Sequence, residues 1–417
     1  MVMSMMSCQS RRSRRLAPLA VIVAVAACTD RGPAERVAMM DSAGVVIVES
    51  YAPAWAGVGW TVAEPPLLEL GVMEGPAEYQ FTNIEGALRL PDGRIVVADG
   101  GAHEIRWFDG EGRFLSSTGR RGDAPGEYRQ INALGYGPGD SVWVYDYRNR
   151  RFTILTADGE LARTMTLGPT LSNVAAVGRL ADGSFVVREY WSAAAMHSPE
   201  IRLGLSRDLA AVARISADGS ELDTLGLFPG REVFIGTERG RGVMSAPLFA
   251  RTTSAALLGS DAVVGDQETF EFGLYAADGS LRRLVRLPQM DLSLSESDIE
   301  RATEERLAAE PPGRRAMWRV HLEAMVVLET RPAYGRLLPD AAGNLWVAGS
   351  SFPSQEPAVW LVFDRDGQLL GPVSVPQRFR VQAIGGDWLL GVWRDEIDVE
   401  RVRLYSLVKA NSQQEAQ

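Results

Sequence analysis

The stretch "GRIVVADGGAHEIRWFDGEGRFL", residues 93–115, holds three short strand-like segments separated by tight turns. The first segment is a continuous apolar run rich in β-branched residues, which is typical of a strand covered on both faces. The other two segments flank the turn Asp109 to Gly112. An acidic-glycine turn between strand-like runs indicates a hairpin, because glycine supplies the positive φ that the turn needs.

The same pattern recurs along the chain, which is the most informative feature of the sequence. In three copies the distance from the strand to the glycine of the hairpin turn is the same: Arg94 to Gly112, Ser141 to Gly159 and Asp261 to Gly279 are each 18 residues apart. Repetition of one supersecondary unit predicts a repeat architecture. The first strands of the six copies are "GRIVVAD" (93–99), "DSVWVYD" (140–146), "GSFVVRE" (183–189), "SDAVVGD" (260–266), "GNLWVAG" (343–349) and "GDWLLGV" (386–392).

The copies predict an all-β fold, a six-bladed β-propeller over residues 45–408. Five copies have the length of a four-stranded meander, whereas the sixth ends at "VRLYSLVK" (402–409) without a partner hairpin and is one strand short. The N-terminal region offers "VVIVES" (45–50) and "LLELG" (67–71) as the missing strand. A strand from the other end of the chain would close the ring and remove its exposed edges.

One segment departs from the repeat and predicts a helical hairpin insertion between blades 4 and 5, at about residues 295–329. "SESDIERATEERLAAE" (295–310) is helical in pattern, with Ser295 and Asp298 as a capping box. In the following helix Met317, Val320, Ala324 and Leu328 share one face. The hairpin is interpreted as a lid packed on the propeller, with a partner-docking helix pair as the alternative. The C-terminal tail, residues 409–417, is expected to be disordered.

The N-terminus predicts export. Arginines at 11, 12, 14 and 15 precede a 12-residue apolar run, residues 16–27, which suits a signal peptide and is too short to cross a bilayer. The run ends in small residues before Cys28, which resembles a bacterial lipobox, so residues 1–27 are predicted to be removed and Cys28 to be lipidated. Residues 28–44 would then be a lipidated flexible linker. The alternative is a plain signal peptide with Cys28 incidental.

The composition limits which classes of partner the chain is expected to bind. The chain has 43 basic and 53 acidic residues, and the signal segment removes four arginines and no acid, so the mature chain carries a net charge of −14. This excess argues against nucleic acid as a partner. The cysteines are Cys8 and Cys28, so the mature domain is expected to have no disulfide. We expect a monomer that meets the membrane only through its lipid, on the outer membrane or the periplasmic face of a Gram-negative bacterium.

These motifs resemble a known group. The stretch 93–115, followed by "GRRGDAPGEY" from Gly119 to Tyr128, is similar to NHL-type repeats and to bacterial extracytoplasmic six-bladed, TolB-like propellers. That group carries a Gly-Arg-x-Gly-x-x-Pro-Gly-Glu-aromatic connector after its first hairpin. The resemblance covers roughly residues 65–408 and implies the fold rather than an activity. It makes residues 117–132 a blade connector in which Tyr128 packs at the entry of the second blade.

Meander topology puts the blade connectors and the ends of the repeated strands on one face, and the Asp-Gly hairpins on the other. Asp99, Asp146, Glu189 and Asp266 end four of the repeated strands on the connector face. Carboxylates around a channel could hold Ca²⁺, which takes oxygen ligands. The favoured interpretation is that each acid accepts hydrogen bonds from the turn after it. Arg120 and Arg121 could line the same face.

The three histidines, His103, His197 and His321, also fall in loops of the connector face. Propeller lyases use histidine-bound zinc, and lactonase-type propellers use oxygen ligands around Ca²⁺. No two of these histidines have a zinc-motif spacing, so three unrelated surface histidines are the favoured interpretation and no metal is assigned.

Two hypotheses about function follow. The first is a lipid-anchored binding or scaffold module that presents its loop-rich face to a protein or small ligand at the cell envelope. The second is a Ca²⁺- or Zn²⁺-dependent hydrolase or lyase with its site at the channel mouth. The sequence assigns no catalytic residue.

Overall fold

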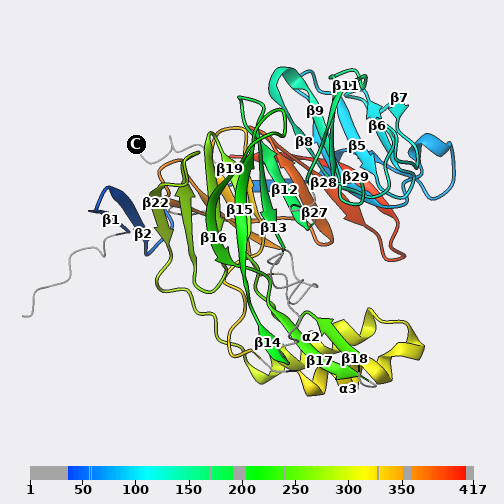
Figure 1. Cartoon of the computed structure of the whole chain (residues 1–417). Helices are drawn as coiled ribbons and strands as arrows, with labels where there is room; N and C mark the ends of the chain where they lie inside the picture. The colour runs from blue at the N-terminus through cyan, green and yellow to red at the C-terminus, as the bar shows by residue number, and fades with distance from the viewer. Residues whose placement is uncertain are drawn as a thin grey trace, which may run out of the picture. The chain divides into compact units, whose positions relative to one another are not determined.

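Antiparallel four-stranded sheets make up most of the protein (Figure 1). The computed structural model describes residues 36–409 except 56, 58, 169–170, 172, 191–202, 239–240, 326–327 and 351–357. The signal segment, Cys28, His197 and residues 410–417 lie outside this part of the chain. The all-β prediction is confirmed.

Six sheets contain the six repeated strands, each as the second strand from the inside, and we number them in chain order. Sheet 1 is β4 (Ile84–Arg89), β5 (Ile95–Asp99), β6 (Glu104–Phe108) and β7 (Phe114–Thr118). Sheet 2 is β8 (Ile131–Tyr136), β9 (Val142–Asp146), β10 (Arg151–Leu155) and β11 (Leu161–Thr166). Sheet 3 is β12 (Val174–Arg179), β13 (Phe185–Glu189), β15 (Leu209–Ile215) and β16 (Leu222–Pro229).

The second half of the chain repeats the pattern. Sheet 4 is β19 (Ser254–Leu258), β20 (Asp261–Gly265), β21 (Glu271–Tyr275) and β22 (Leu281–Arg286). Sheet 5 is β23 (Leu337–Pro339), β24 (Leu345–Ala348), β25 (Val359–Phe363) and β26 (Leu369–Ser374). Sheet 6 is β27 (Phe379–Ile384), β28 (Trp388–Arg394), β29 (Glu400–Val408) and, from the N-terminal region, β3 (Thr61–Leu70).

The innermost strands contact one another in succession. β4 contacts β8, β8 contacts β12, and the series continues through β19, β23 and β27 back to β4. Glycines of the Asp-Gly hairpins take the positive φ expected of them, with +85° at Gly112, +88° at Gly159 and +81° at Gly279. Short 3₁₀ turns lie at η1 (Ala77–Tyr79), η2 (Pro138–Asp140) and η4 (Pro312–Arg314).

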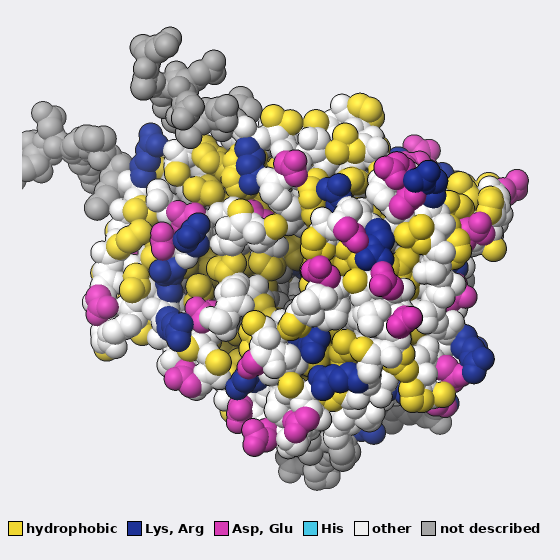
Figure 2. Space-filling model, turned by 90° about the horizontal axis from the view of Figure 1, so that it is seen from above, with side chains coloured by type: hydrophobic (Ala, Val, Ile, Leu, Met, Phe, Trp, Pro, Cys, Tyr) yellow, Lys and Arg dark blue, Asp and Glu magenta, His cyan; other side chains and the backbone are white. Residues whose placement is uncertain are grey.

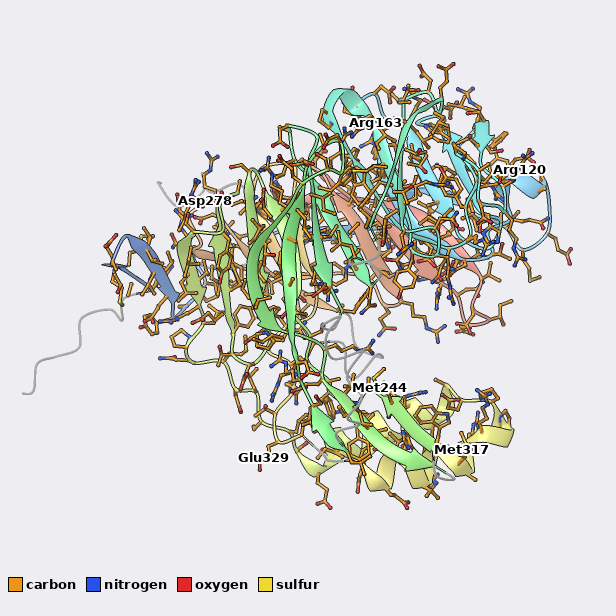
Figure 3. All side chains as sticks on the ribbon, viewed as in Figure 1. Arg120, Arg163, Met244, Asp278, Met317 and Glu329 are labelled. Atoms are coloured by element: carbon orange, nitrogen blue, oxygen red, sulfur yellow. The ribbon has the colours of Figure 1, made fainter. Side chains whose placement is uncertain are left out.

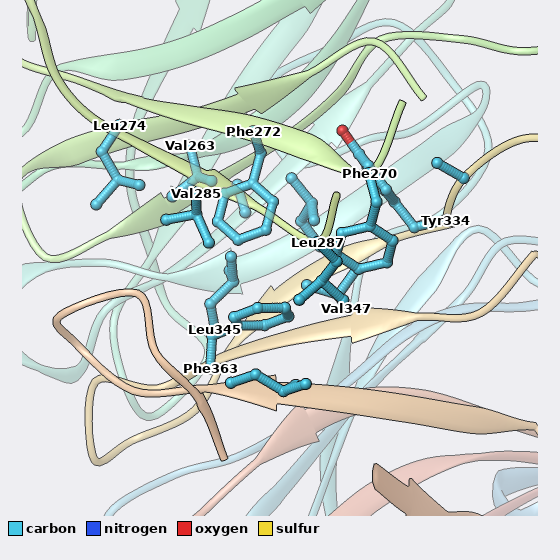
Figure 4. Close-up of a cluster of buried hydrophobic side chains, with 14 residues drawn as sticks. Val263, Phe270, Phe272, Leu274, Val285, Leu287, Tyr334, Leu345, Val347 and Phe363 are labelled. Carbon is cyan, nitrogen blue, oxygen red and sulfur yellow. The ribbon is translucent and has the colours of Figure 1, made fainter. Parts of the chain in front are cut away.

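Apolar side chains fill each space between neighbouring sheets, and this explains the continuous apolar runs. In β5, Ile95 and Val97 pack toward sheet 6 whereas Val96 and Ala98 pack toward sheet 2. Every residue of such a strand therefore enters a core, because successive side chains point to opposite faces. Figure 4 shows the cluster between sheets 4 and 5, where Phe272 and Phe363 meet edge to face with ring centroids 5.4 Å apart.

The two N-terminal strand candidates have different places. "LLELG" belongs to β3, which pairs antiparallel with β29, Leu68 opposite Leu404. "VVIVES" is β2 (Val45–Ser50), which pairs parallel with β22 on the outer edge of sheet 4. β1 (Val37–Ser42) forms a hairpin with β2. The predicted flexible linker over 28–44 is therefore wrong for residues 37–42, because they form β1 and pair with β2 in a hairpin.

Three insertions form a separate small body, which we call the appendage. Its members are β14 (Gly204–Ser206), β17 (Val233–Glu238), β18 (Arg241–Ser245), α2 (Glu296–Ala308) and α3 (Arg315–Ala324). In the chain, β14 follows β13. The strands β17 and β18 lie between sheets 3 and 4, and the helices lie between sheets 4 and 5. Figure 3 shows Met244 and Met317 in the appendage, away from Asp278 in a hairpin at the other end of sheet 4.

The helices of the appendage pack on its strands, not on the four-stranded sheets as the lid interpretation expects. Leu307, Leu322 and Met325 form a cluster with Phe234 and Trp318. The face predicted for the second helix is wrong in part, since Met317 is 47% and Val320 66% exposed. α3 ends at Ala324, so the helical periodicity does not continue to Leu328. The predicted capping box is confirmed: Ser295 and Asp298 exchange both hydrogen bonds at the start of α2.

Candidate functional site

The buried carboxylates Asp99 and Asp146 hold loops together. Both are 0% exposed. Asp99 accepts from the backbone N–H of Gly101 and Ala102 at 3.1 Å and pairs with Arg106 at 3.4 Å. Asp146 accepts from the N–H groups of Arg129, 2.6 Å, and Asn149, 2.9 Å. Each carboxylate thus ties its own loop, as the favoured interpretation expects, and its oxygens are already used.

The corresponding acids of sheets 3 and 4 differ. Glu189 accepts from the N–H of Ala211 in β15, 3.0 Å, and Asp266 accepts from that of Glu268, 3.0 Å. In sheet 4 the residue that holds the connector is the next one, Gln267. Its side chain accepts a hydrogen bond from the N–H of Thr252 at 2.9 Å, and the residue is 4% exposed. Alignment of the repeats does not identify Gln267, because in sheet 4 the residue that bonds the connector comes one position after the strand-end acid.

The connector from Gly119 to Tyr128 is held internally. Arg120 pairs with Glu127 at 2.6 Å, and Tyr128 is fully buried as predicted. Arg151 of β10 donates to the carbonyls of Asp123, 2.7 Å, and Ala124, 2.8 Å. Arg120 is therefore committed to the connector (Figure 3). Arg121 is exposed, and its backbone bridges to Tyr128.

The described histidines lie in different parts of the fold. His103 follows β5 in sheet 1, and its Nδ1 is buried without a hydrogen-bond partner. His321 is in α3, where its Nε2 lies 2.7 Å from the hydroxyl of Ser245. Within the described ranges there is no group of three or more His, Cys, Asp or Glu side chains that could hold a metal ion.

Charged residues gather instead where sheets 5, 6 and 1 meet on the connector face. We call Glu85, Arg336, Arg380, Arg394 and Glu400 the charge cluster. Arg336 precedes β23 and donates to the carbonyl of Val381 in β27, 2.9 Å. Arg380 of β27 donates to the carbonyl of Ile84 in β4. Each arginine thus spans from one innermost strand to the next.

Two other members, Arg394 and Glu400, form an ion pair with each other. Both Nε and Nη2 of Arg394 donate to Oε1 of Glu400, at 2.9 and 2.6 Å. The other carboxylate oxygen accepts the backbone N–H of Ile84. Glu400 is 6% exposed and bonds both Arg394 and the backbone of β4, so it links sheet 6 to sheet 1 although the Arg394 side chain itself is 52% exposed.

Arg336 and Arg380 differ from Arg394 in having no carboxylate at ion-pair distance in the described residues, and both residues are exposed to solvent. Burial lowers the pKa of Arg336 to about 10, with a further contribution from the charge of Arg380. Burial also lowers the pKa of Arg380, and the carboxylates of Glu400 and Glu85 partly oppose it. The two side chains are thus accessible from solvent, while the surrounding protein weakens the hydration of their charges.

Glu85 supplies the acceptor of the cluster. Its carboxylate accepts from Asn83 Nδ2 at 2.6 Å. Desolvation raises its pKa, whereas the bond from Asn83 and the charge of Arg380 lower it. A hollow of about 420 Å³ is lined by Phe81, Thr82 and Glu400 among others, and its lining does not include Glu85, Arg336 or Arg380. The cluster can bind an anion through guanidinium N–H groups and accept one hydrogen bond beside it.

Sequence reasoning misses Arg336 and Arg380. Each is a single arginine near the start of an innermost strand, and the two occupy different positions of the repeat, so no repeated residue marks them. Only the arrangement of the strands brings them together. On the opposite, hairpin face, Figure 2 shows basic and acidic side chains mixed around a central recess, with no gathering of one sign.

No protein-family model and no curated protein matches the chain. Among solved structures, a member of the DUF4221 family from Bacteroides vulgatus is similar over 85% of this chain and 99% of its own, with 12% identity and a TM-score of 0.52. A gluconolactonase from Xanthomonas campestris covers 83% and 99% with 13% identity and a TM-score of 0.44. Virginiamycin B lyase from Staphylococcus aureus covers 81% and 98% with 12% identity and a TM-score of 0.40.

The latter two TM-scores lie below 0.5 and carry no functional weight. The first likeness establishes a propeller-type fold for this chain and, at 12% identity, nothing about its activity. In the described part of the chain, no helix has the length and apolar character needed to span a membrane.

Proposed function

We propose that the chain is a lipid-anchored six-bladed β-propeller that acts as a binding module for a small ligand at the cell envelope. The six-bladed assignment rests on the succession of contacts between innermost strands, β4 through β27 and back to β4. The pairing of β3 with β29 supports closure by an N-terminal strand. The helical hairpin between sheets 4 and 5 is then an insertion at the connector face.

The anchor is a proposal from the sequence. Cys28 would carry the lipid after removal of residues 1–27, at the outer membrane or the periplasmic face. Radiolabelled palmitate should be incorporated into the wild-type protein in cells, and Cys28→Ser should lose the label. Continued labelling of the variant would overturn the assignment.

The charge cluster is the observation that carries the binding function. Its two arginines lie at the start of neighbouring innermost strands, are open to solvent, and have no carboxylate at ion-pair distance in the described residues. Charged side chains that are open to solvent and lack an ion-pair partner are candidates for ligand contacts.

The test is a screen with a defined metabolite library against the exported protein, purified in mild detergent. Ligands found by thermal shift would be mapped by hydrogen exchange. We expect protection at the starts of β4, β23 and β27, and none at the Asp-Gly hairpins. Protection only at the hairpins or only in the appendage would contradict the proposed face, and a library without a ligand would count against a small-ligand module.

The metal-dependent hydrolase or lyase remains a separate hypothesis with its own measurement. Zinc and calcium content of the purified protein would be determined before and after chelation, together with its melting temperature. A stoichiometric metal ion that is lost with His103→Ala or Asp99→Asn would favour it over a binding module.

A further inference from the structure

We infer that Arg336 and Arg380 together bind the carboxylate groups of a small organic anion, and that Glu85 accepts a hydrogen bond from a hydroxyl of the same molecule. This inference rests on the proposed function and adds the chemical class of the ligand.

The two guanidinium groups have donors to spare. A guanidinium carries five N–H donors in a planar fork that matches a carboxylate. In the described hydrogen bonds each guanidinium uses one nitrogen as a donor. Arg336 donates to the carbonyl of Val381, and Arg380 donates to the carbonyl of Ile84. Because each of these bonds goes to a neutral carbonyl, neither positive charge is neutralised by it. Both bonds fix the stems of the side chains while leaving the rest of each fork available.

Arg151, Arg106 and Arg394 are more fully bonded than Arg336 and Arg380. Arg151 donates to three carbonyls of the connector and is 7% exposed. Arg106, 6% exposed, pairs with Asp99 and Glu104 and also donates to two carbonyls. Arg394 is spent on Glu400. Arg336 and Arg380 each donate to one carbonyl and have no carboxylate at ion-pair distance in the described residues, so most of their N–H donors are not used within the described structure.

Electrostatics favours a bound anion. Each of the two positive charges is desolvated, and the charge of Arg380 acts on Arg336. A carboxylate placed between them would replace lost hydration and relieve the repulsion, since charge-assisted bonds are strongest in such surroundings.

Glu85 makes the site selective. Its charge lowers the net positive charge of the opening, so a bare anion is disfavoured relative to one that also donates a hydrogen bond. The carboxylate is within electrostatic reach of Arg380 and retains acceptor capacity beyond its bond to Asn83. A hydroxy acid satisfies both kinds of group.

Malate is a suitable probe, because it has two carboxylates and one hydroxyl. Binding would be measured by isothermal titration to the exported protein in mild detergent at pH 7, with neutral malamide, succinate and inorganic phosphate as comparisons. We expect malate to bind, succinate to bind more weakly, and malamide not to bind. Arg336→Gln and Arg380→Gln should each weaken malate by roughly tenfold or more, as loss of one charge-assisted contact does.

Arg121→Gln is the matched control, since Arg121 is exposed on the same face, outside the cluster, and should leave malate binding unchanged. Arg336→Lys and Arg380→Lys keep the charge without the fork and should bind at an intermediate level. They also keep the test decisive if a glutamine variant fails to fold, which circular dichroism would show.

Three outcomes would overturn the inference: malate binding that both arginine variants leave unchanged, phosphate binding as tight as malate, or no anion binding at all. Equal binding of succinate and malate would overturn the role of Glu85. If a neutral metabolite from the screen still protects β4, β23 and β27, the proposed binding module stands while the anion site falls.

Discussion

The four-stranded sheets and the appendage differ in how much core each possesses. The cluster between sheets 4 and 5 contains 14 buried residues, whereas the two clusters of the appendage contain three buried residues each, with partly buried side chains around them. The sheets share such clusters with a neighbour on each side. The appendage is made of three insertions that pack on one another.

This difference teaches where the stability of the protein lies. Hydrophobic burial scales with the apolar area removed from water, so the sheets hold most of the folding free energy. Regions with few buried contacts open locally at low free energy. We expect the sheets to unfold as a unit and the appendage to open separately. The following changes test that expectation, from the largest effect to the smallest.

The largest effect should come from Phe363→Ala. Phe363 is 0% exposed between sheets 4 and 5 and packs edge to face on Phe272. Loss of such a ring leaves a cavity and costs about 3–5 kcal/mol of unfolding free energy. Denaturant titration followed by far-ultraviolet circular dichroism would measure it. Leu115→Ala, at a side chain that is 50% exposed, is the control and should change little; a loss below about 1 kcal/mol for Phe363→Ala would contradict the interlocked core.

A smaller and localised effect is expected for Leu307→Ala in the appendage. Leu307 is 5% exposed and packs near Leu322 and Met325. Truncating a buried leucine costs about 2–5 kcal/mol, and a small core that can collapse favours the lower end. Hydrogen exchange should become faster in α2, α3 and β17 and stay slow in β5 and β9. Equal acceleration in the sheets would show that the two regions unfold together.

The same comparison explains what the sequence could predict. The repeated strands were predictable because every residue of a strand such as β5 enters one of two cores, which makes a continuous apolar run. The capping box at Ser295 was predictable because it is local. The sequence does not show which of β2 and β3 pairs with β29. Both come from short apolar segments, and the pairing depends on strands that are distant in the chain.

The charge cluster could not be predicted for a related reason. Arg336 and Arg380 are 44 residues apart in the chain, and each stands alone in its repeat. They become neighbours only when β23 and β27 lie side by side. The strand-end acids were predictable in position, and the favoured hydrogen-bonded role followed from turn chemistry common to all repeats.

The smallest expected effect is on the pH dependence of stability. It compares one carboxylate in the appendage with one in the sheets. Asp298, in the capping box of α2, has its pKa lowered to about 2, first by the hydroxyl of Ser295. Asp182, in the turn before β13, has its pKa lowered to about 2, first by Ser184. A lowered pKa in the folded state means that each contribution to stability is present above the unfolded pKa, near 3.8, and is lost as pH falls toward 2.

Because the appendage has little core in reserve, protonation of Asp298 should open α2 before the sheets respond. Limited pepsin digestion between pH 4 and pH 2 would detect this as early cleavage within α2 and α3. Asp298→Asn should already be cleaved at pH 4 and lose most of the pH dependence, since its side chain cannot become the charged acceptor. Asp182→Asn should leave the cleavage pattern of the helices unchanged. Cleavage that begins in the sheets, or an unaltered profile for Asp298→Asn, would show that the appendage does not have the weaker core.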